Sequence, residues 1–321
     1  MTRRSHGWLP LAAALVVLTL SGCQTGASSK HPGTSKAVTP SSTAHAAAVQ
    51  PVSKIAFISN RTGTFNVYVV NADGGGLRQV TRFRSGDVAR PSLSPDGKSV
   101  VFDRSKTANG DFDIWIVRSD GHGLRDLTPG PGDDTAPSWS PDGTKVLFAS
   151  DRAGAYDIFV MKASGRGIVQ LSDRGRGDLA PAFSRDGKRV AFVECDQSFH
   201  CQLWAMNANG KGARRLTKTP VEAERPSWSL NDTKLAVTVK QAGNLDVAVV
   251  VVRGGTLQRL THGAADDFQP SYSPDGTGIA FGSNRAGPPS LYVMQADGTQ
   301  VSSLTSPNKG QDEAPHWQPP G

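Results

Sequence analysis

The sequence lacks several features that would assign it to a common functional class. It contains no run of five or more like charges, so its formal net charge of +7 does not indicate nucleic-acid binding. The apolar stretch at residues 8–20 is shorter than the ~20 residues that a membrane-spanning helix needs. The signatures of serine hydrolases, zinc peptidases and phosphate-binding loops are missing. No catalytic constellation is therefore predicted, and we expect a protein that is not an enzyme.

Glycine and proline are common, but their arrangement excludes fibrous structure. The 35 glycines follow no three-residue period, which excludes a collagen-like chain. An apolar content of 37% is too high for a chain that is disordered throughout. With 321 residues the chain is long enough to bury a sizeable core. The composition favours a loop-rich all-β fold.

Residues 1–22 have the organisation of a bacterial secretion signal. Arg3 and Arg4 supply positive charge, and a 13-residue apolar stretch follows at 8–20. The next residues, Leu-Ser-Gly-Cys, end at Cys23 and resemble the lipobox of bacterial lipoproteins, in which the cysteine accepts a diacylglyceryl group. We therefore expect lipidation of Cys23. The alternative is an ordinary signal peptide with an incidental cysteine.

The segment after this cysteine has the composition of a tether. Residues 24–50 contain no Phe, Tyr, Trp, Leu or Ile, so they cannot bury enough apolar surface to offset the entropy of ordering. We expect residues 23–53 to be a lipidated, flexible linker with a mean span of about 30 Å. The folded part would then be a membrane-anchored lipoprotein of the bacterial cell envelope, outside the cytoplasm.

From residue 54 onward the chain repeats itself. A phrase of the type Arg-Pro-Ser-Leu-Ser-Pro-Asp-Gly recurs, and its leading prolines are spaced by 46, 44, 45, 44 and 45 residues. These prolines are Pro91, Pro137, Pro181, Pro226, Pro270 and Pro315. Each repeat holds four short apolar runs, and Asp-Gly-type pairs such as Asp73-Gly74 predict tight hairpins between the last two. Four antiparallel strands repeated at this period predict an all-β, six-bladed β-propeller over residues 54–321.

The two ends of the repeat region complement each other. The region begins with a second strand at 54–58 and ends with a lone first strand at 314–318. The C-terminal strand is therefore expected to join the N-terminal blade and close the ring, which also removes two exposed sheet edges.

The recurring motifs resemble those of the TolB-like propeller repeat. They are Ser-Pro-Asp-Gly, Ser-Asp-Arg152 with Gly154, Asp157-Ile158, Ala72-Asp73-Gly74 and a closing Leu-Thr, and the resemblance covers about residues 54–319. The resemblance implies a six-bladed ring that lies outside the cytoplasm and acts by binding.

Most of the repeated residues are expected to carry the fold. A large side chain stands two residues after each leading proline, which suits packing between neighbouring blades. These side chains are Leu93, Trp139, Phe183, Trp228, Tyr272 and Trp317. The Asp of Ser-Pro-Asp-Gly is expected to bond the backbone of its own turn. The residue before the large side chain is small in the other copies, but in the last copy it is His316. We interpret this histidine as tolerated at the chain end.

Two cysteines flank one loop. Cys195 and Cys201 lie six residues apart between a second and a third strand, and an exported protein meets an oxidising environment. We predict a disulfide across this loop. A metal site with His200 is the alternative, although two thiols and one imidazole leave it short of a ligand.

The strand directions place the longer loops at one end of the ring. These loops connect successive blades or join the second and third strands of one blade, and binding sites are usually located on such loops. Each inter-blade loop carries an acid three or four residues before its proline. We call this set the mouth acids: Asp87, Asp134, Asp178, Glu222, Asp267 and Asp312. We predict that they bind a cation, with Ca²⁺ the best match to loose oxygen coordination, or a basic segment of a partner. The alternative is that they pair with Arg61, Arg152 and Arg285 or cap loop backbone.

The pattern as a whole predicts a non-catalytic, membrane-tethered scaffold that binds an envelope or secreted protein. The alternative is a secreted lyase or hydrolase that acts on cell-wall or environmental polysaccharide, with two mouth acids as acid and base.

Overall fold

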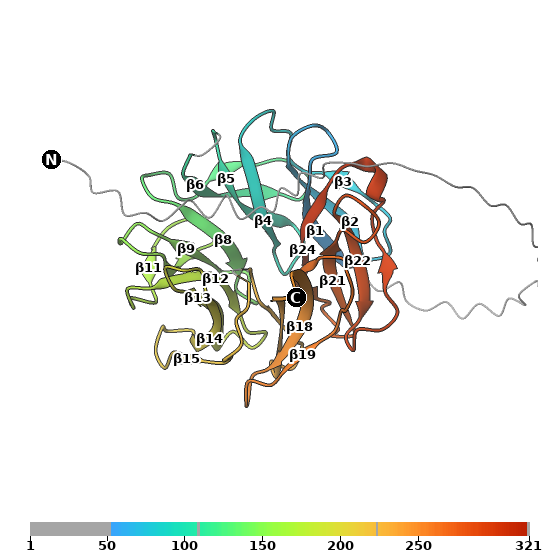
Figure 1. The fold of residues 1–321 in the computed structure, drawn as a ribbon. Coiled ribbons are helices and arrows are strands. Elements are labelled where there is room, and N and C mark those ends of the chain that lie inside the picture. The colour runs from blue at the N-terminus through green and yellow to red at the C-terminus, as the bar shows by residue number, and fades with distance from the viewer. Residues whose placement is uncertain (1–52, 108–109, 223, 320–321) are drawn as a thin grey trace, which may run out of the picture. The chain divides into compact units, whose positions relative to one another are not determined.

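A computed structural model describes residues 53–107, 110–222 and 224–319, and Cys23 and residues 1–52 lie outside this part of the chain. The described residues form six four-stranded antiparallel sheets, as predicted. The sheets are arranged around a central channel as the blades of a propeller (Figure 1). No helix in these ranges is both long enough and apolar enough to cross a membrane.

Each blade takes its innermost strand from one copy of the repeated phrase. For blades 1 to 6 these strands are β24 (Asp312–Trp317), β4 (Asp87–Leu93), β8 (Asp134–Trp139), β12 (Gly177–Phe183), β16 (Ser227–Trp228) and β20 (Asp267–Tyr272). The second strands are β1 (Lys54–Ser59), β5 (Ser99–Ser105), β9 (Lys145–Ser150), β13 (Arg189–Cys195), β17 (Lys234–Gln241) and β21 (Gly278–Ser283).

The outer half of each blade is a hairpin with a very short last strand. The third strands are β2 (Asn66–Asn71), β6 (Phe112–Arg118), β10 (Asp157–Lys162), β14 (Cys201–Asn207), β18 (Asn244–Val251) and β22 (Ser290–Gln295). The outermost strands are β3 (Arg78–Gln79), β7 (Arg125–Asp126), β11 (Val169–Gln170), β15 (Arg214–Arg215), β19 (Leu257–Arg259) and β23 (Ser302–Ser303). A 3-10 turn, η2 (Pro307–Lys309), precedes β24.

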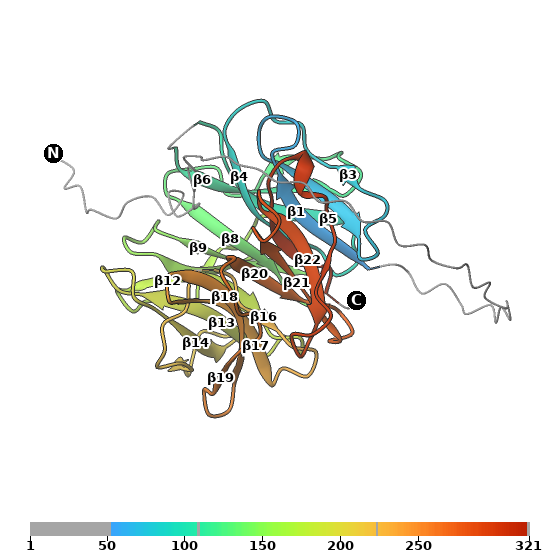
Figure 2. The same cartoon turned by 45° about the vertical axis from the view of Figure 1, so that its right-hand side comes forward.

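Closure of the ring by the C-terminal strand is confirmed. Blade 1 has the order β24-β1-β2-β3, and β24 pairs antiparallel with β1, for example Ile55 with Trp317. Figure 1 shows β24, the last strand of the chain, next to the first strand β1, and Figure 2 shows the same propeller turned by 45°. The two ends of the propeller are therefore joined by antiparallel strand pairing, which one bulge interrupts.

A hydroxyl compensates for each short outer strand. In blade 1 the Thr81 Oγ1 accepts the backbone N–H of Val67 at 2.9 Å, and in blade 2 the Thr128 Oγ1 accepts that of Ile114 at 2.8 Å. The corresponding acceptors in blades 3 to 6 are Ser172, Thr217, Thr261 and Thr305. The hydroxyl residue that closes each repeat thus accepts a backbone N–H of the third strand. The short outermost strand cannot provide an acceptor for this N–H.

The core lies between blades rather than inside any one of them. One cluster joins Ile58 and Val67 of blade 1 to Leu93 and Phe102 of blade 2, and similar clusters join other neighbouring blades. The indole Nε1 of Trp139 donates to the carbonyl of Ser92 in the preceding blade at 3.0 Å. The predicted packing role is therefore borne out for the large side chains after the prolines, except that Phe183 is only partly buried.

The predicted disulfide is present. Cys195 ends β13 and Cys201 begins β14, where the two residues are direct cross-strand partners, and their sulfur atoms are 1.99 Å apart. The bond closes the five-residue loop at the end of this hairpin.

Candidate functional site

Three of the mouth acids are paired with the arginines that the sequence placed near them. Arg61 Nη2 lies 2.7 Å from Asp312 Oδ1, and Arg285 Nη2 lies 2.7 Å from Asp267 Oδ1. Arg152 pairs with Asp134 in the same way. In each case the arginine Nε also donates to a serine hydroxyl, and its guanidinium lies over two aromatic rings of the blade, as Arg61 lies over Phe57 and Tyr68.

The other three acids have different surroundings. Asp178 lies 3.3 Å from Arg174 Nη2, and burial raises its pKa to about 6 although Arg174 opposes the shift. Burial also raises the pKa of Glu222, whereas Lys240 lowers it. Asp87 is exposed. The ring of acids is therefore largely neutralised by arginines, which is the alternative that the sequence left open.

Within the described ranges, no three His, Cys, Asp or Glu side chains lie close enough to hold a metal ion. Binding of Ca²⁺ or of a basic segment by the mouth acids stays a prediction. Its electrostatic basis is reduced, because a carboxylate that already has a guanidinium partner contributes less field to the channel.

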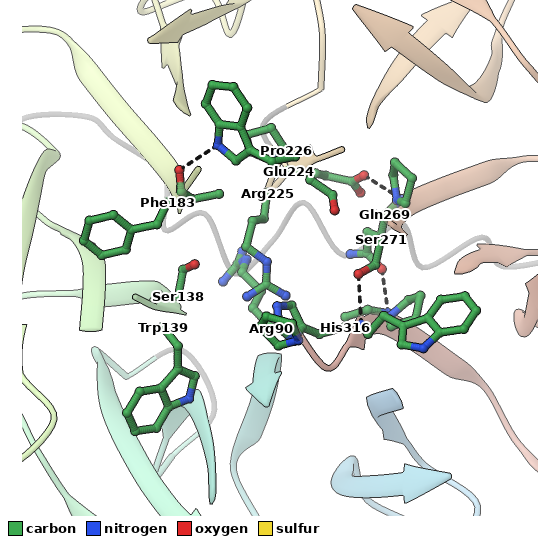
Figure 3. Close-up of a pocket in the computed structure, with 18 of the residues that line it drawn as sticks. Arg90, Ser138, Trp139, Phe183, Glu224, Arg225, Pro226, Gln269, Ser271 and His316 are labelled. Carbon is green, nitrogen blue, oxygen red and sulfur yellow. Dashed lines mark hydrogen bonds between the residues drawn. The ribbon is translucent and has the colours of Figure 1, made fainter. Parts of the chain in front are cut away.

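A pocket in the central channel forms the candidate site, and all six innermost strands or their flanking residues line it. It extends toward the end of the ring that carries the Asp-Gly turns, because Pro141 and Arg185 of those turns contribute to its wall. Figure 3 shows Arg90 and Arg225 pointing toward one another in the channel, with His316 beside them. None of the mouth acids lines this pocket.

A backbone irregularity directs side chains into the channel. The residue before the leading proline has a positive φ in five blades, and the register with the second strand shifts there. These residues are Arg90 (φ 43°), Ala136 (53°), Ala180 (51°), Gln269 (53°) and Ala314 (53°). Such left-handed residues are strained unless their surroundings hold them. In blade 5, which has the two-residue strand β16, Arg225 occupies this position without a positive φ.

The surrounding blades hold these bulges with polar contacts. Arg90 Nη1 donates to Asp103 Oδ2 at 2.5 Å and to Thr135 Oγ1 at 2.6 Å, so its charge is paired. Burial works against this cation, but the Asp103 carboxylate outweighs it and raises the pKa of Arg90. In blade 6 the bulge N–H of Gln269 donates to Glu224 Oε2 at 3.0 Å.

Arg225 crosses the channel. Its Nη1 donates to the carbonyl of Pro137 at 2.8 Å and its Nη2 to the carbonyl of Pro91 at 2.9 Å, which belong to blades 3 and 2. Its pKa is lowered to about 10, mainly by burial, which Asp103 opposes and Arg90 reinforces. The side chain therefore remains a cation at neutral pH, held by carbonyl oxygens.

His316 has a structural role that the sequence analysis did not assign. In blades 5 and 6 the hydroxyls of Ser227 and Ser271 accept the N–H of Tyr272 and Trp317. In blade 1 the His316 Nδ1 accepts the N–H of Leu93 at 3.1 Å in the same manner. Burial, followed by Arg225 and Arg185, holds the pKa of this imidazole well below its usual value, so the ring is neutral.

Sequence reasoning missed these channel residues because it looked for what the repeats share. The channel residues stand where a copy departs from the others: Arg90 and Arg225 where three copies have alanine, Arg185 where four have proline, and His316 where four have serine. Those departures were the available signal.

Comparison with known proteins shows which family the propeller resembles. Residues 51–234 and 221–321 match the TolB beta propeller domain. A TolB homologue from Chlorobium luteolum is 31% identical over 242 residues, which are 75% of this chain and 34% of that protein. The crystal structure of TolB from Acinetobacter baumannii superposes with a TM-score of 0.72 and 24% identity, covering 83% of this chain and 67% of that chain.

The chain spans two fifths or less of the length of the curated relatives it matches. An oligogalacturonate lyase from Vibrio parahaemolyticus also superposes, with a TM-score of 0.52 and 13% identity over 74% of this chain and 73% of that one, and shares the fold alone. The propeller by itself therefore does not decide between binding and catalysis.

Proposed function

Since the chain belongs to the family of the TolB beta propeller domain, we propose that it is a non-catalytic scaffold that binds a protein of the cell envelope. The observation that carries this proposal is the channel pocket, to which all six blades contribute. Its polar lining includes the guanidiniums of Arg90, Arg185 and Arg225, the carboxyl of Glu224 and the imidazole of His316. Such groups recognise a ligand by hydrogen bonds and charge.

The location outside the cytoplasm is supported by the disulfide. Cys195 and Cys201 join across a loop, and structural disulfides persist mainly in exported proteins. Together with the signal-like residues 1–22, this supports an exported protein.

Cross-linking in native membranes, followed by mass spectrometry, tests the scaffold. We expect one envelope or secreted protein to be cross-linked reproducibly, with cross-links on channel or loop residues. Turnover of cell-wall or environmental polysaccharide by the purified chain, abolished by a substitution such as Asp267→Asn, would instead establish the enzymatic alternative.

Lipidation at Cys23 is a separate part of the proposal. A diacylglyceryl group should place the wild-type protein in the detergent phase of a Triton X-114 partition, because each buried methylene contributes about 0.8 kcal/mol. Cys23→Ala should move it to the aqueous phase. Unchanged partitioning would reject the anchor and leave the scaffold proposal intact.

A further inference from the structure

Three nitrogen-bearing side chains line the channel pocket from three blades. Arg185 follows β12, Arg225 precedes β16, and His316 lies in β24. Figure 3 shows Arg225 and His316 side by side in the channel. They meet at the end of the ring opposite the mouth acids, since the turn residues Pro141 and Arg185 share this wall.

The two arginines have more donors than partners. A guanidinium carries five N–H donors. Arg225 uses two of its nitrogens on proline carbonyls. Arg185 Nη2 donates to the Tyr272 carbonyl at 3.4 Å, and its Nε is buried with no partner among the described residues. Buried donors without partners favour binding of an acceptor.

Their charge is compensated only at longer range, by Asp232 for Arg185 and by Asp103 for Arg225, in contrast to Arg90 and to the arginines beside the mouth acids. Arg61, Arg90, Arg152 and Arg285 each have a carboxylate within 4 Å. Over the described part of the chain, neither Arg185 nor Arg225 has one. Burial lowers the pKa of both, which is the expected sign for a cation with little compensation.

His316 adds a neutral donor. Its Nδ1 accepts the Leu93 N–H, so in the neutral imidazole the proton resides on Nε2. This Nε2 lies 3.5 Å from the Ser92 hydroxyl, a contact too long to satisfy the donor fully. An N–H beside two guanidiniums suits an anion and opposes a metal cation. Among the anions, Glu224 in the same wall disfavours a doubly charged phosphate more than a singly charged carboxylate.

We propose that this end of the channel binds a carboxylate, held by the guanidiniums of Arg185 and Arg225 and by the imidazole of His316. The planar carboxylate matches the fork of a guanidinium, and the partly buried Phe183 and the buried Trp139 provide an apolar wall that strengthens the pairing. Its source is either an acidic segment of a partner protein or a free carboxylic acid. The site goes beyond the proposed scaffold role, because it would bind a carboxylate whether or not an envelope protein docks.

The chain itself supplies matched substitutions. Arg185→Leu introduces the residue found at the same turn position in blade 5, Leu230, and keeps the backbone N–H that donates to Asp232. Arg225→Gln introduces the residue of blade 6, Gln269. His316→Ser introduces the residue of Ser271, whose hydroxyl already accepts the equivalent N–H. Arg176→Leu, a largely exposed arginine outside the pocket, is the control for net charge.

Calorimetry with succinate, with a pentapeptide ending in two glutamates, with inorganic phosphate and with succinamide tests the proposal. We expect at least one carboxylate probe to bind and succinamide not to bind. Arg185→Leu and Arg225→Gln should each weaken binding about tenfold or more, whereas Arg176→Leu should leave it unchanged. Binding of the peptide alone would indicate a protein segment as the source, and binding of succinate would indicate a free acid.

Three results would contradict the carboxylate site. Absence of binding by both carboxylate probes at about 10 mM would overturn the proposal. So would wild-type affinity in Arg185→Leu, a variant that changes only a turn side chain, or tighter binding of phosphate than of either carboxylate. None of these outcomes affects the cross-linking of an envelope partner, so the two proposals can fail separately.

Discussion

Glu313 provides a test of how burial in the closing strand affects stability. It lies in β24, opposite Ile58 of β1, and its side chain is buried. Burial raises its pKa from 4.5 to about 7, with further contributions from Glu224 and Asp312. The ionised form is therefore less stable in the folded protein than in the unfolded chain.

The sign of the pH dependence follows from this shift. Because the folded state binds the proton more tightly, the stabilisation is fully present below about pH 4.5 and is lost as the pH rises through about 7. A shift of about 2.5 units corresponds to about 3 kcal/mol at 1.36 kcal/mol per unit. Glu224, whose pKa burial also raises to about 7, titrates over the same range, so the two carboxyls act as a coupled pair.

Glu313→Gln removes the ionisation while keeping the shape. We expect equal stability of variant and wild type near pH 4.5, and a gain of about 2 kcal/mol for the variant at pH 8, after allowing for imperfect hydrogen bonding of the amide. For a domain of this size the gain raises Tm by roughly 4–8 °C. Urea denaturation and calorimetry at the two pH values measure both quantities.

The control is Asp111→Asn, which removes an exposed carboxylate. This variant should leave the difference in unfolding free energy between pH 4.5 and pH 8 almost unchanged. If Glu313→Gln destabilises the protein more at pH 8 than at pH 4.5, the carboxylate makes favourable contacts that outweigh its desolvation. A difference between variant and wild type that does not change with pH would refute the argument.

Three further predictions concern closure, the outer strands and the mouth acids. Deletion of residues 312–321 removes β24 and Trp317 from blade 1, so calorimetry should show a loss of the cooperative transition or a Tm lower by more than about 10 °C; an unchanged Tm would contradict closure. Thr128→Val leaves the Ile114 N–H without its acceptor and should cost about 1–3 kcal/mol in urea denaturation, whereas the exposed Thr107→Val should cost little; equal effects would remove the role assigned to the hydroxyl. In titrations with Ca²⁺ and with a Lys-rich peptide, the triple variant Asp134→Asn, Asp178→Asn, Asp267→Asn should lose less affinity than Asp87→Asn with Glu222→Gln, because arginines already neutralise the first three acids; the reverse order would show that paired acids still bind cations.

The sequence by itself determined the architecture, because the architecture rests on local and periodic features. The 44–46-residue period set the number of blades. The turn Asp was also predictable, since Asp96 Oδ1 accepts the N–H of Lys98 two residues away. The disulfide followed from two cysteines at the ends of one hairpin, and closure followed from the phase of the repeat at each end. In all of these the partners are neighbours in sequence or occupy equivalent positions in successive copies.

Only the tertiary structure decided which charges compensate one another. Arg61 and Asp312 are 251 residues apart, and ring closure brings them together. The sequence could name both residues and the possible pairing, but it could not exclude an open ring of acids, because side-chain direction depends on loop conformation.

The channel pocket was also beyond sequence reasoning. Arg225 reaches carbonyls in two blades on the other side of the ring, 88 and 134 residues away. Arg90 has its direction from a bulge with a positive φ, which its residue type does not favour. A repeat pattern describes the average blade, whereas residues of all six blades meet at the centre of the ring. The few residues that differ between blades therefore determine its charge and its chemistry.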